Sequence, residues 1–208
     1  ASTEAVLNTG IAKEKIITLF NPVDVSWFDS FARSHRIAPT PGHRFLYVGQ
    51  LIARKNVGAL IQAFALIKQG DDRLLIAGDG PLLDELKATA ASLGVGDVVD
   101  FLGHKNQEKL ATIYASSNTF ILPSTSEVWG LVVNEALASG LHAVVSDKCG
   151  AAEFVENMPG CYITQTDSRS IADAMNSAEK ARIKLVLLSF STILVCAFIS
   201  TLIIGLFV

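Results

Sequence analysis

The sequence predicts an α/β protein with a Rossmann-like, doubly wound parallel sheet and a C-terminal hydrophobic helix. From about residue 44 onward, short apolar runs alternate with segments of helical periodicity, as they do in folds of this class. The runs are mostly continuous, which is typical of strands covered by helices on both faces. The final segment, residues 185–208, contains no charged residue and no proline.

Six apolar runs are predicted to be strands: residues 45–48, 74–77, 98–101, 120–123, 143–146 and 161–164. Four segments between them carry apolar residues at three- and four-residue spacing, and most end at glycine or small polar residues, as helices do. These predicted helices lie within residues 56–70, 81–94, 107–117 and 130–140. The right-handed crossover rule then places ligands at the carboxyl ends of the strands.

Residues 1–43 do not follow this alternation cleanly. A short helix is expected at "TEAVLNTG" and a strand at "KIITLF". The stretch 26–44 contains two prolines, two histidines and no clear period, so we interpret it as a linker into the main domain. The chain begins with Ala rather than Met, and we expect it to be a fragment or a processed product.

Charge and cysteine content exclude several kinds of partner. The net charge of -3 argues against a broad basic surface for nucleic acid. Cys149, Cys161 and Cys196 are odd in number and lack C-x-x-C spacing, which indicates no disulfide framework or zinc site and favours a reducing compartment. Asp71 and Asp72 precede a predicted strand, away from the ligand edge, so we interpret them as a solvated turn. No metal or cofactor is predicted.

Four loops at the ligand edge supply candidate site residues. They bring Gly49, Arg54 and Lys55 after the first strand, Gly78 and Gly80 after the second, "LGHKN" from Leu102 after the third, and the motif "SEVWGLVVNEALASG" after the fourth. Glycines allow the backbone to approach a ligand closely, although those at 78 and 80 can equally serve the turn alone.

The motif after the fourth strand suits a ligand with both phosphate and hydroxyl groups. Gly130 directly precedes a helix, whose first N–H groups and dipole favour a phosphate. Glu135 leans back toward that helix start, and Glu127 lies in the loop before it. Since carboxylates accept hydrogen bonds from neutral hydroxyls, the two glutamates fit a nucleotide-sugar. The open alternatives are that Glu135 is an exposed helix residue and Glu127 an ordinary helix-start acid.

Together these motifs resemble the donor-binding, C-terminal half of group 1 (family 4-like) retaining glycosyltransferases with the two-domain GT-B fold. The resemblance covers about residues 6–163 and includes "NPVD", "YVGQLIARKN", "IAGDGP", "VDFLGH" and "LPSTSEVWGLVVNEALASG" in this order. The last motif keeps the family's spacing of two glutamates eight positions apart.

The resemblance implies a role for each candidate residue. Glu135 is expected to bind the ribose hydroxyls and Glu127, the candidate catalytic residue, the donor sugar, with no covalent nucleophile assigned. Lys55 is expected to neutralise the diphosphate. The backbone N–H groups near the diphosphate and the loop that borders the base complete the expected donor site, which contains Gly49, Gln50, Arg54, Lys55, Gly78, Gly80, Leu102, Gly103, Glu127, Gly130, Leu131, Val132 and Glu135.

Departures from the family pattern leave alternatives open. Gln50 stands where the family usually has Arg, and Arg54 is the candidate to compensate. The implied protein transfers a sugar from a nucleotide-diphosphate sugar to a glycan or lipid-linked acceptor, with retention. The alternatives are a membrane-tethered nucleotide-sugar binding module without turnover and a nicotinamide-dependent dehydrogenase, which the lack of G-x-G-x-x-G after the first strand disfavours.

The expected organisation has four parts. Residues 1–43 are a remnant of an N-terminal acceptor domain and a linker, residues 44–168 bind the donor, residues 169–184 form a helix, and residues 185–208 cross a membrane. Basic residues before the last segment favour a membrane-associated protein whose main domain faces the cytoplasm. A buried helix or a wrong reading frame at the C-terminal end are the alternatives.

Overall fold

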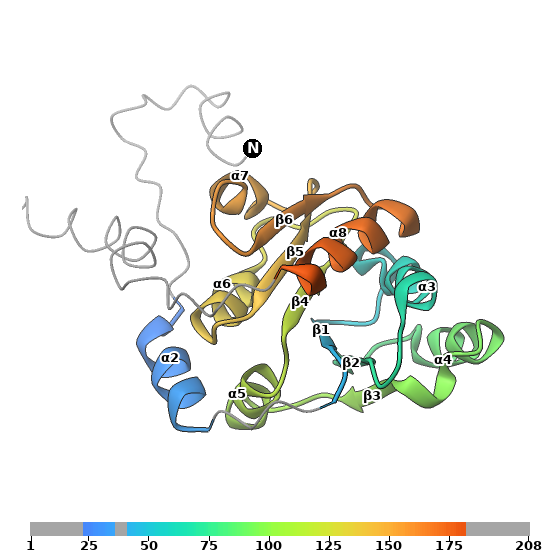
Figure 1. Ribbon diagram of the computed structural model, residues 1–208, viewed down its shortest axis with the longest axis horizontal. Helices are drawn as coiled ribbons and strands as arrows, with labels where there is room; N and C mark the ends of the chain where they lie inside the picture. Colours follow the sequence, from blue (N-terminus) through green and yellow to red (C-terminus); the bar gives the residue numbers. More distant parts are fainter. Residues whose placement is uncertain (1–22, 36–40, 182–208) are drawn as a thin grey trace, which may run out of the picture. The chain divides into compact units, whose positions relative to one another are not determined.

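The computed structural model describes residues 23–35 and 41–181. Within these ranges six parallel strands form one sheet in the order β3-β2-β1-β4-β5-β6 (Figure 1). The strands are β1 (Arg44–Val48), β2 (Arg73–Ala77), β3 (Val99–Gly103), β4 (Thr119–Leu122), β5 (His142–Ser146) and β6 (Cys161–Thr164). All six predicted strands are therefore confirmed.

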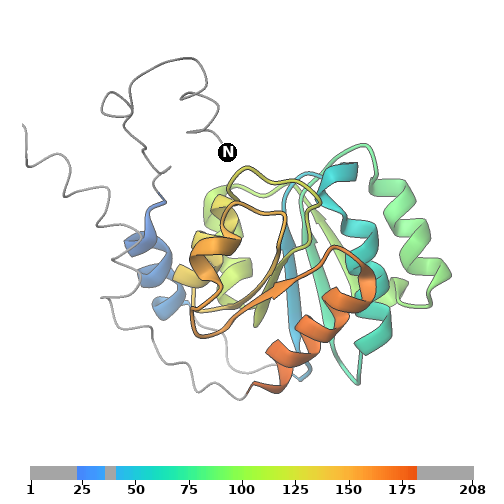
Figure 2. The ribbon, with the colours of Figure 1, turned by 90° about the horizontal axis from the view of Figure 1, so that it is seen from above.

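The described helices are α2 (Val25–Ser34), α3 (Val57–Ile67), α4 (Leu83–Ser92), α5 (Gln107–Ala115), α6 (Leu131–Ala138), α7 (Ala152–Val155) and α8 (Ser168–Lys180), with short 3-10 turns η2 (Ala53–Lys55) and η3 (Gly96–Val98). Figure 2 shows α3, α4 and α8 on one face of the sheet and α5, α6 and α2 on the other. Helices on both faces confirm the doubly wound architecture.

Burial explains the continuous apolar runs of the strands. The strands β1, β2, β4 and β5 are buried from their second residue or earlier to their last, whereas β3 and β6 are only partly buried. The latter two are the edges of the sheet. Aromatic residues such as Phe45, Tyr47 and Phe120 have no exposed surface, so helices cover both faces of the central strands.

The strand order reverses at β1, whose neighbours are β2 on one side and β4 on the other. Phe45 of β1 pairs with Leu74 of β2 and with Thr119 of β4. These three strands therefore run level and end at the same edge. In an open α/β sheet such a switch point is where ligands bind, outside the carboxyl ends of the strands.

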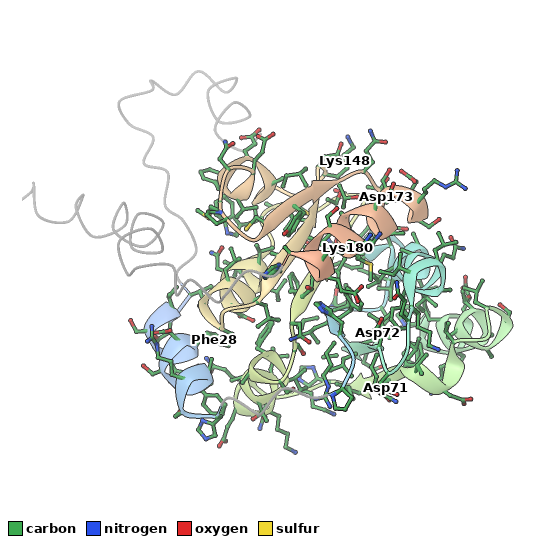
Figure 3. The ribbon with its side chains drawn as sticks, in the orientation of Figure 1. Phe28, Asp71, Asp72, Lys148, Asp173 and Lys180 are labelled. Carbon is green, nitrogen blue, oxygen red and sulfur yellow. The ribbon has the colours of Figure 1, made fainter. Side chains whose placement is uncertain are left out.

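Residues 26–44 were interpreted as a linker because they have no clear period, but the first part of this segment is helical. Residues Val25–Ser34 form α2, and the side chain of Asp24 caps it by accepting a hydrogen bond from Trp27 N. Phe28 is 2% exposed and lies on the side of α2 that faces α5 and α6 (Figure 3). The helix forms because burying this one aromatic face against two other helices favours it.

Asp72 also differs from the expectation of a solvated turn. It is 4% exposed, while its neighbour Asp71 is exposed (Figure 3). Its two carboxylate oxygens accept hydrogen bonds from His43 N at 2.7 Å and Gln69 N at 2.9 Å. Asp72 therefore satisfies two backbone donors at the amino edge of the sheet, opposite the edge where ligands are expected.

Several expectations fall outside the described residues. These are the helix and strand expected within residues 1–20 and the apolar segment 185–208. In the part of the chain that the structure describes, no helix combines the length and apolar character needed to cross a membrane.

The environment of His43 predicts a pH dependence of stability. Burial lowers the pKa of His43 from 6.5 to about 4, although Asp72 acts in the opposite direction. Between these two values the unfolded chain binds more protons than the folded one, so the free energy of unfolding falls as the pH drops from about 6.5 to about 4. The contribution of one histidine is at most about 1.4 kcal/mol per pH unit.

Urea unfolding at pH 7, 6 and 5 measures this effect. His43→Gln is expected to have a shallower pH dependence than the unmodified chain, while His104→Gln, at an exposed position, keeps the original slope. Equal slopes for all three proteins would contradict the assignment to His43.

Candidate functional site

Two loops meet at the switch point of the sheet, one after β1 and one after β4. Thr125 N donates a hydrogen bond to Arg54 O at 2.8 Å, and Arg54 Nη1 donates to Ser126 O at 3.2 Å. The 3-10 turn η2 lies in the first of these loops. Arg54 and Ser126 are 72 positions apart in the sequence. They come together because the parallel strands before them end at the same edge of the sheet.

Asn56 ties three strand ends together. Its side-chain amide donates to Pro123 O at 3.1 Å, after β4, and to Thr166 O at 2.7 Å, after β6. The residue has a left-handed backbone (φ 57°) and lies at the N-cap of α3. Asparagine tolerates this conformation better than most residues. Asn56 is not among the residues predicted for the site, although asparagine before an apolar helix is a common N-cap signal.

The glycines after β2 are explained by contact with the loop after β1. A Cβ atom on Gly78 would lie 1.8 Å from Gly49 O, and one on Gly80 would lie 2.5 Å from Leu51 O. Gly78 N in turn donates to Gly103 O at 3.0 Å, so the loops after β1, β2 and β3 are stacked side by side. The close approach that these glycines permit is to the chain's own backbone; contact with a ligand remains a prediction.

The helix α6 begins where the sequence predicted, directly after Gly130. The φ angle of Gly130 is 92°, and a Cβ atom there would lie 2.7 Å from Leu122 Cδ2. Among the described residues no side chain caps α6, which leaves the N–H groups of Leu131 and Val132 directed out of the helix start. The same Cβ position is 3.7 Å from Glu127 Cγ, so Glu127 lies beside this helix start.

Glu127 is paired with cations of the loop after β1. Lys55 Nζ donates to Glu127 Oε2, and Arg54 Nη1 is 3.5 Å from the same oxygen. The side chains of Lys55 and Glu127 are 12% and 13% exposed, whereas that of Arg54 is 47% exposed. The structure therefore brings together Arg54, Lys55 and Glu127, and Glu127 is part of a largely buried ion pair rather than an exposed helix-start acid.

The loop after β5 fixes the backbone of Glu127, and none of its residues was among the predicted site residues. Glu127 N donates to Lys148 O at 3.2 Å, and Gly150 N donates to Glu127 O at 3.0 Å. A Cβ atom on Gly150 would lie 2.1 Å from Val128 O, so only glycine allows this approach. Burial raises the pKa of the adjacent Cys149 thiol to about 12, with Glu127 adding to the effect.

Glu135 is bonded to a buried tyrosine that the sequence did not indicate. Tyr114 Oη donates to Glu135 Oε2 at 3.0 Å. Burial raises the pKa of Glu135, and the hydrogen bond from Tyr114 partly offsets this by favouring the charged form. Glu135 is half-buried, so the alternative of an exposed helix residue does not hold.

The remaining candidates flank this centre. The Gln50 side chain is exposed, and its carbonyl accepts a hydrogen bond from Tyr47 Oη at 2.9 Å. Leu102 and Gly103 end the edge strand β3, where Lys105 Nζ donates to Leu102 O. Within residues 23–35 and 41–181 no group of three or more His, Cys, Asp or Glu side chains could hold a metal ion.

The role of Asn56 gives a stability prediction. Asn56→Asp keeps the shape of the side chain but replaces the donating amide by a carboxylate that faces two carbonyl oxygens. We expect the free energy of unfolding to fall by about 2–3 kcal/mol, because two hydrogen bonds are lost and their acceptors stay partly buried. Chemical denaturation measures this loss.

Asn106→Asp is the matched control, because the side-chain oxygen of Asn106 caps α5 by accepting from Lys109 N. A carboxylate accepts this bond equally well and favours the helix dipole, so stability is expected to stay the same or to rise slightly. Equal losses in both variants would show that Asn56 does not act through its amide donor.

Comparisons with known proteins identify the family. The family model for glycosyl transferases group 1 matches residues 31–187. An uncharacterized glycosyltransferase of Methanocaldococcus jannaschii is 31% identical over 176 residues, which are 81% of this chain and 45% of that protein. This chain spans less than half the length of the first curated relatives that it matches.

Solved structures share the fold. Anabaena HepE in complex with UDP and glucose has a TM-score of 0.79 at 20% identity, over 98% of this chain and 60% of that chain. The C-terminal domain of a glycosyl transferase group 1 protein from Francisella tularensis has a TM-score of 0.66 at 20% identity, over 79% of this chain and 90% of that chain. The chain therefore belongs to the group 1 family of glycosyl transferases, as its motifs suggested.

Proposed function

We propose that this chain is the donor-binding half of a retaining glycosyltransferase that transfers a sugar from a nucleotide-diphosphate sugar to a glycan or lipid-linked acceptor. The observation that carries the proposal is the meeting of Lys55, Glu127 and the uncapped start of α6 at the switch point of the sheet. Family membership and the UDP bound by a neighbour of the same fold support a nucleotide-sugar as the ligand.

The diphosphate is proposed to bind at the start of α6. Backbone N–H groups of Gly130, Leu131 and Val132 would donate to its oxygens, where the helix dipole favours negative charge. Lys55 and Arg54 would supply positive charge, since both approach Glu127 beside this helix start. Arg54 would provide the second cation that the site otherwise lacks, because the neutral Gln50 stands where the family usually has an arginine.

The two carboxylates are proposed to bind the two sugars of the donor. Glu127, held by the loops after β1 and β5, would accept hydrogen bonds from hydroxyls of the transferred sugar. Glu135, one turn into α6, would accept hydrogen bonds from the ribose. Leu102 and Gly103 would border the base, and Gly49, Gly78 and Gly80 would shape the wall between base and diphosphate.

Catalysis is proposed to need a second domain across the site. Closure of two domains assembles the reacting groups and excludes water, so this chain alone should bind the donor but transfer little sugar. Glu127 would act as the catalytic residue by orienting the transferred sugar, with no covalent nucleophile assigned. Gln50 keeps a second candidate open, a binding module without turnover, which donor hydrolysis by a full-length form would exclude.

Nucleotide binding tests the proposal. UDP, ADP or GDP at millimolar concentration is expected to raise the melting temperature, because a ligand of the folded state stabilises it by RT ln(1 + [L]/Kd). Glu135→Gln should weaken both the nucleotide and its hexose conjugates by about 1.5–3 kcal/mol, because both contain ribose. Glu127→Gln should weaken only the conjugates and leave the free nucleotide bound as well or better, since Lys55 loses its competing partner.

Glu108→Gln is the control, because Glu108 is exposed in the first turn of α5. Calorimetric titration of the three variants against the unmodified chain gives the affinities. Absence of any thermal shift with all three nucleotides would refute the proposed function. Equal losses for nucleotide and conjugate in both site variants would refute the division of roles.

We also propose that residues 185–208 anchor the protein in a membrane, with the donor-binding domain on the cytoplasmic side. The segment is uncharged, follows the basic residues Lys180, Arg182 and Lys184, and has a length that suits one span. A single span without acidic residues has no evident ion or proton role, so anchoring is the simplest function.

Deletion of residues 185–208 should move the protein from the membrane fraction to the soluble fraction and leave nucleotide affinity unchanged. Fractionation and calorimetric titration measure the two effects. Unfolding of the shortened chain, or its continued recovery in the membrane fraction after carbonate washing, would contradict an anchor.

A further inference from the structure

The hydroxyl of Tyr114 donates a hydrogen bond to one of the two carboxylate oxygens of Glu135. It donates to Oε2 at 3.0 Å, and the structure gives Oε1 no such partner among the described residues. We infer that Tyr114 is a positioning residue, which holds Glu135 so that its second oxygen is presented to the ribose of the donor. This inference rests on the proposed function and adds a residue that its motifs do not contain.

The ring of Tyr114 has little freedom to move. Tyr114 lies on α5 with no exposed surface. The ring of Phe28 packs against it edge-on, with centroids 5.9 Å apart and planes at 83°, and that of Phe120 at 6.4 Å and 58°. A ring fixed by α2 on one side and by β4 on another keeps its hydroxyl in one place, so the bonded carboxylate is kept in place as well.

The chemistry of the pair also suits this role. Burial, the charge of Glu135 and the hydrogen bond to it raise the pKa of Tyr114 well above 10, so the hydroxyl remains a donor throughout the physiological range. The same bond opposes the burial that raises the pKa of Glu135. Tyr114 thus fixes the carboxylate and favours its ionised form, which accepts hydrogen bonds from hydroxyls through both oxygens.

Positioning has a measurable benefit because a free glutamate side chain loses rotamer entropy when it binds. Glutamate is among the side chains that lose the most rotamer freedom when they are fixed in one conformation. A carboxylate that is already fixed in the folded protein loses less conformational entropy when ribose binds, and this favours binding. The effect should appear only with ligands whose ribose hydroxyls reach Glu135.

A purely structural role is the competing explanation. A buried hydroxyl needs a hydrogen-bond partner, and Glu135 is within reach from the neighbouring helix. In that case loss of the hydroxyl changes stability and affects all nucleotides alike. The two explanations therefore differ in whether the loss of affinity depends on the ribose hydroxyls.

The test is Tyr114→Phe in the full 208-residue chain, which removes the hydroxyl and keeps the ring. UDP, ADP and GDP are titrated together with their 2′,3′-dideoxy analogues. For the nucleotide that binds, we expect affinity to fall by about three- to tenfold, which corresponds to one hydrogen bond of about 0.6–1.4 kcal/mol. Affinity for the dideoxy analogue should change by less than about twofold, since that ligand does not use Glu135.

Two further measurements separate positioning from stability. In Glu135→Gln, addition of Tyr114→Phe should cause little further loss of affinity, because both changes act on one contact. Loss of the hydroxyl should also shift the acid side of the pH profile for nucleotide affinity to higher pH, because Glu135 then takes up a proton more readily. Tyr162→Phe, in the edge strand β6, is the matched control and should change none of these values.

Each outcome decides the inference. Equal losses for ribose and dideoxy ligands, or no loss for either, would overturn it while the proposed function stands. Absence of binding by the unmodified chain would overturn the proposed function and this inference with it. If Tyr114→Phe fails to fold, Phe28→Leu replaces it: this variant loosens the ring but keeps the hydroxyl, and an unchanged preference for ribose over dideoxy ligands in it would again overturn the inference.

Discussion

The side-chain amide of Asn56 is the contact on which the geometry of the site depends. It joins the loop after β1 to the carbonyls of Pro123 and Thr166, which follow β4 and β6. The sheet brings these strand ends to one edge, and the hydrogen bonds between Arg54 and the loop after β4 act together with Asn56 to hold the loops against each other. With Asn56 bonded on both sides, the two preceding residues, Arg54 and Lys55, are held against the loop that contains Glu127.

Local sequence patterns were sufficient to predict most of the sheet and its covering helices. The central strands were predicted correctly because strands buried on both faces consist mostly of apolar residues. Gly130 marks the start of α6 because only glycine fits its backbone conformation and its close contact with Leu122. The spacing of Glu127 and Glu135 predicted that both lie near this helix start. Their partners from other elements could not be predicted in the same way.

What the sequence did not reveal depends on contacts between distant segments. The helix α2 was interpreted as part of a linker because its stretch contains prolines and histidines and shows no clear period. Phe28 becomes informative only when α5 and α6 cover it. Asp72 was expected to be solvated because it precedes a strand at the edge away from the ligand, yet it accepts a hydrogen bond from the backbone of His43, the residue before β1. Tyr114 reads as an ordinary core residue, since periodicity predicts burial of its ring but not the partner of its hydroxyl.

The two glutamates are held by opposite means, and this difference bears on how a donor would bind. Glu127 and Lys55 are nearly buried and neutralise each other, so a ligand that takes Lys55 away must also satisfy Glu127, because an unpaired buried charge is costly. A free diphosphate offers an anion to Lys55 but leaves Glu127 without a partner, whereas a nucleotide-sugar would offer an anion to Lys55 and hydroxyls to Glu127. Glu135 has a neutral partner, Tyr114, and can accept ribose hydroxyls without breaking an ion pair. If the proposed donor binds in this way, the intact nucleotide-sugar is expected to bind more tightly than the nucleotide that remains after transfer.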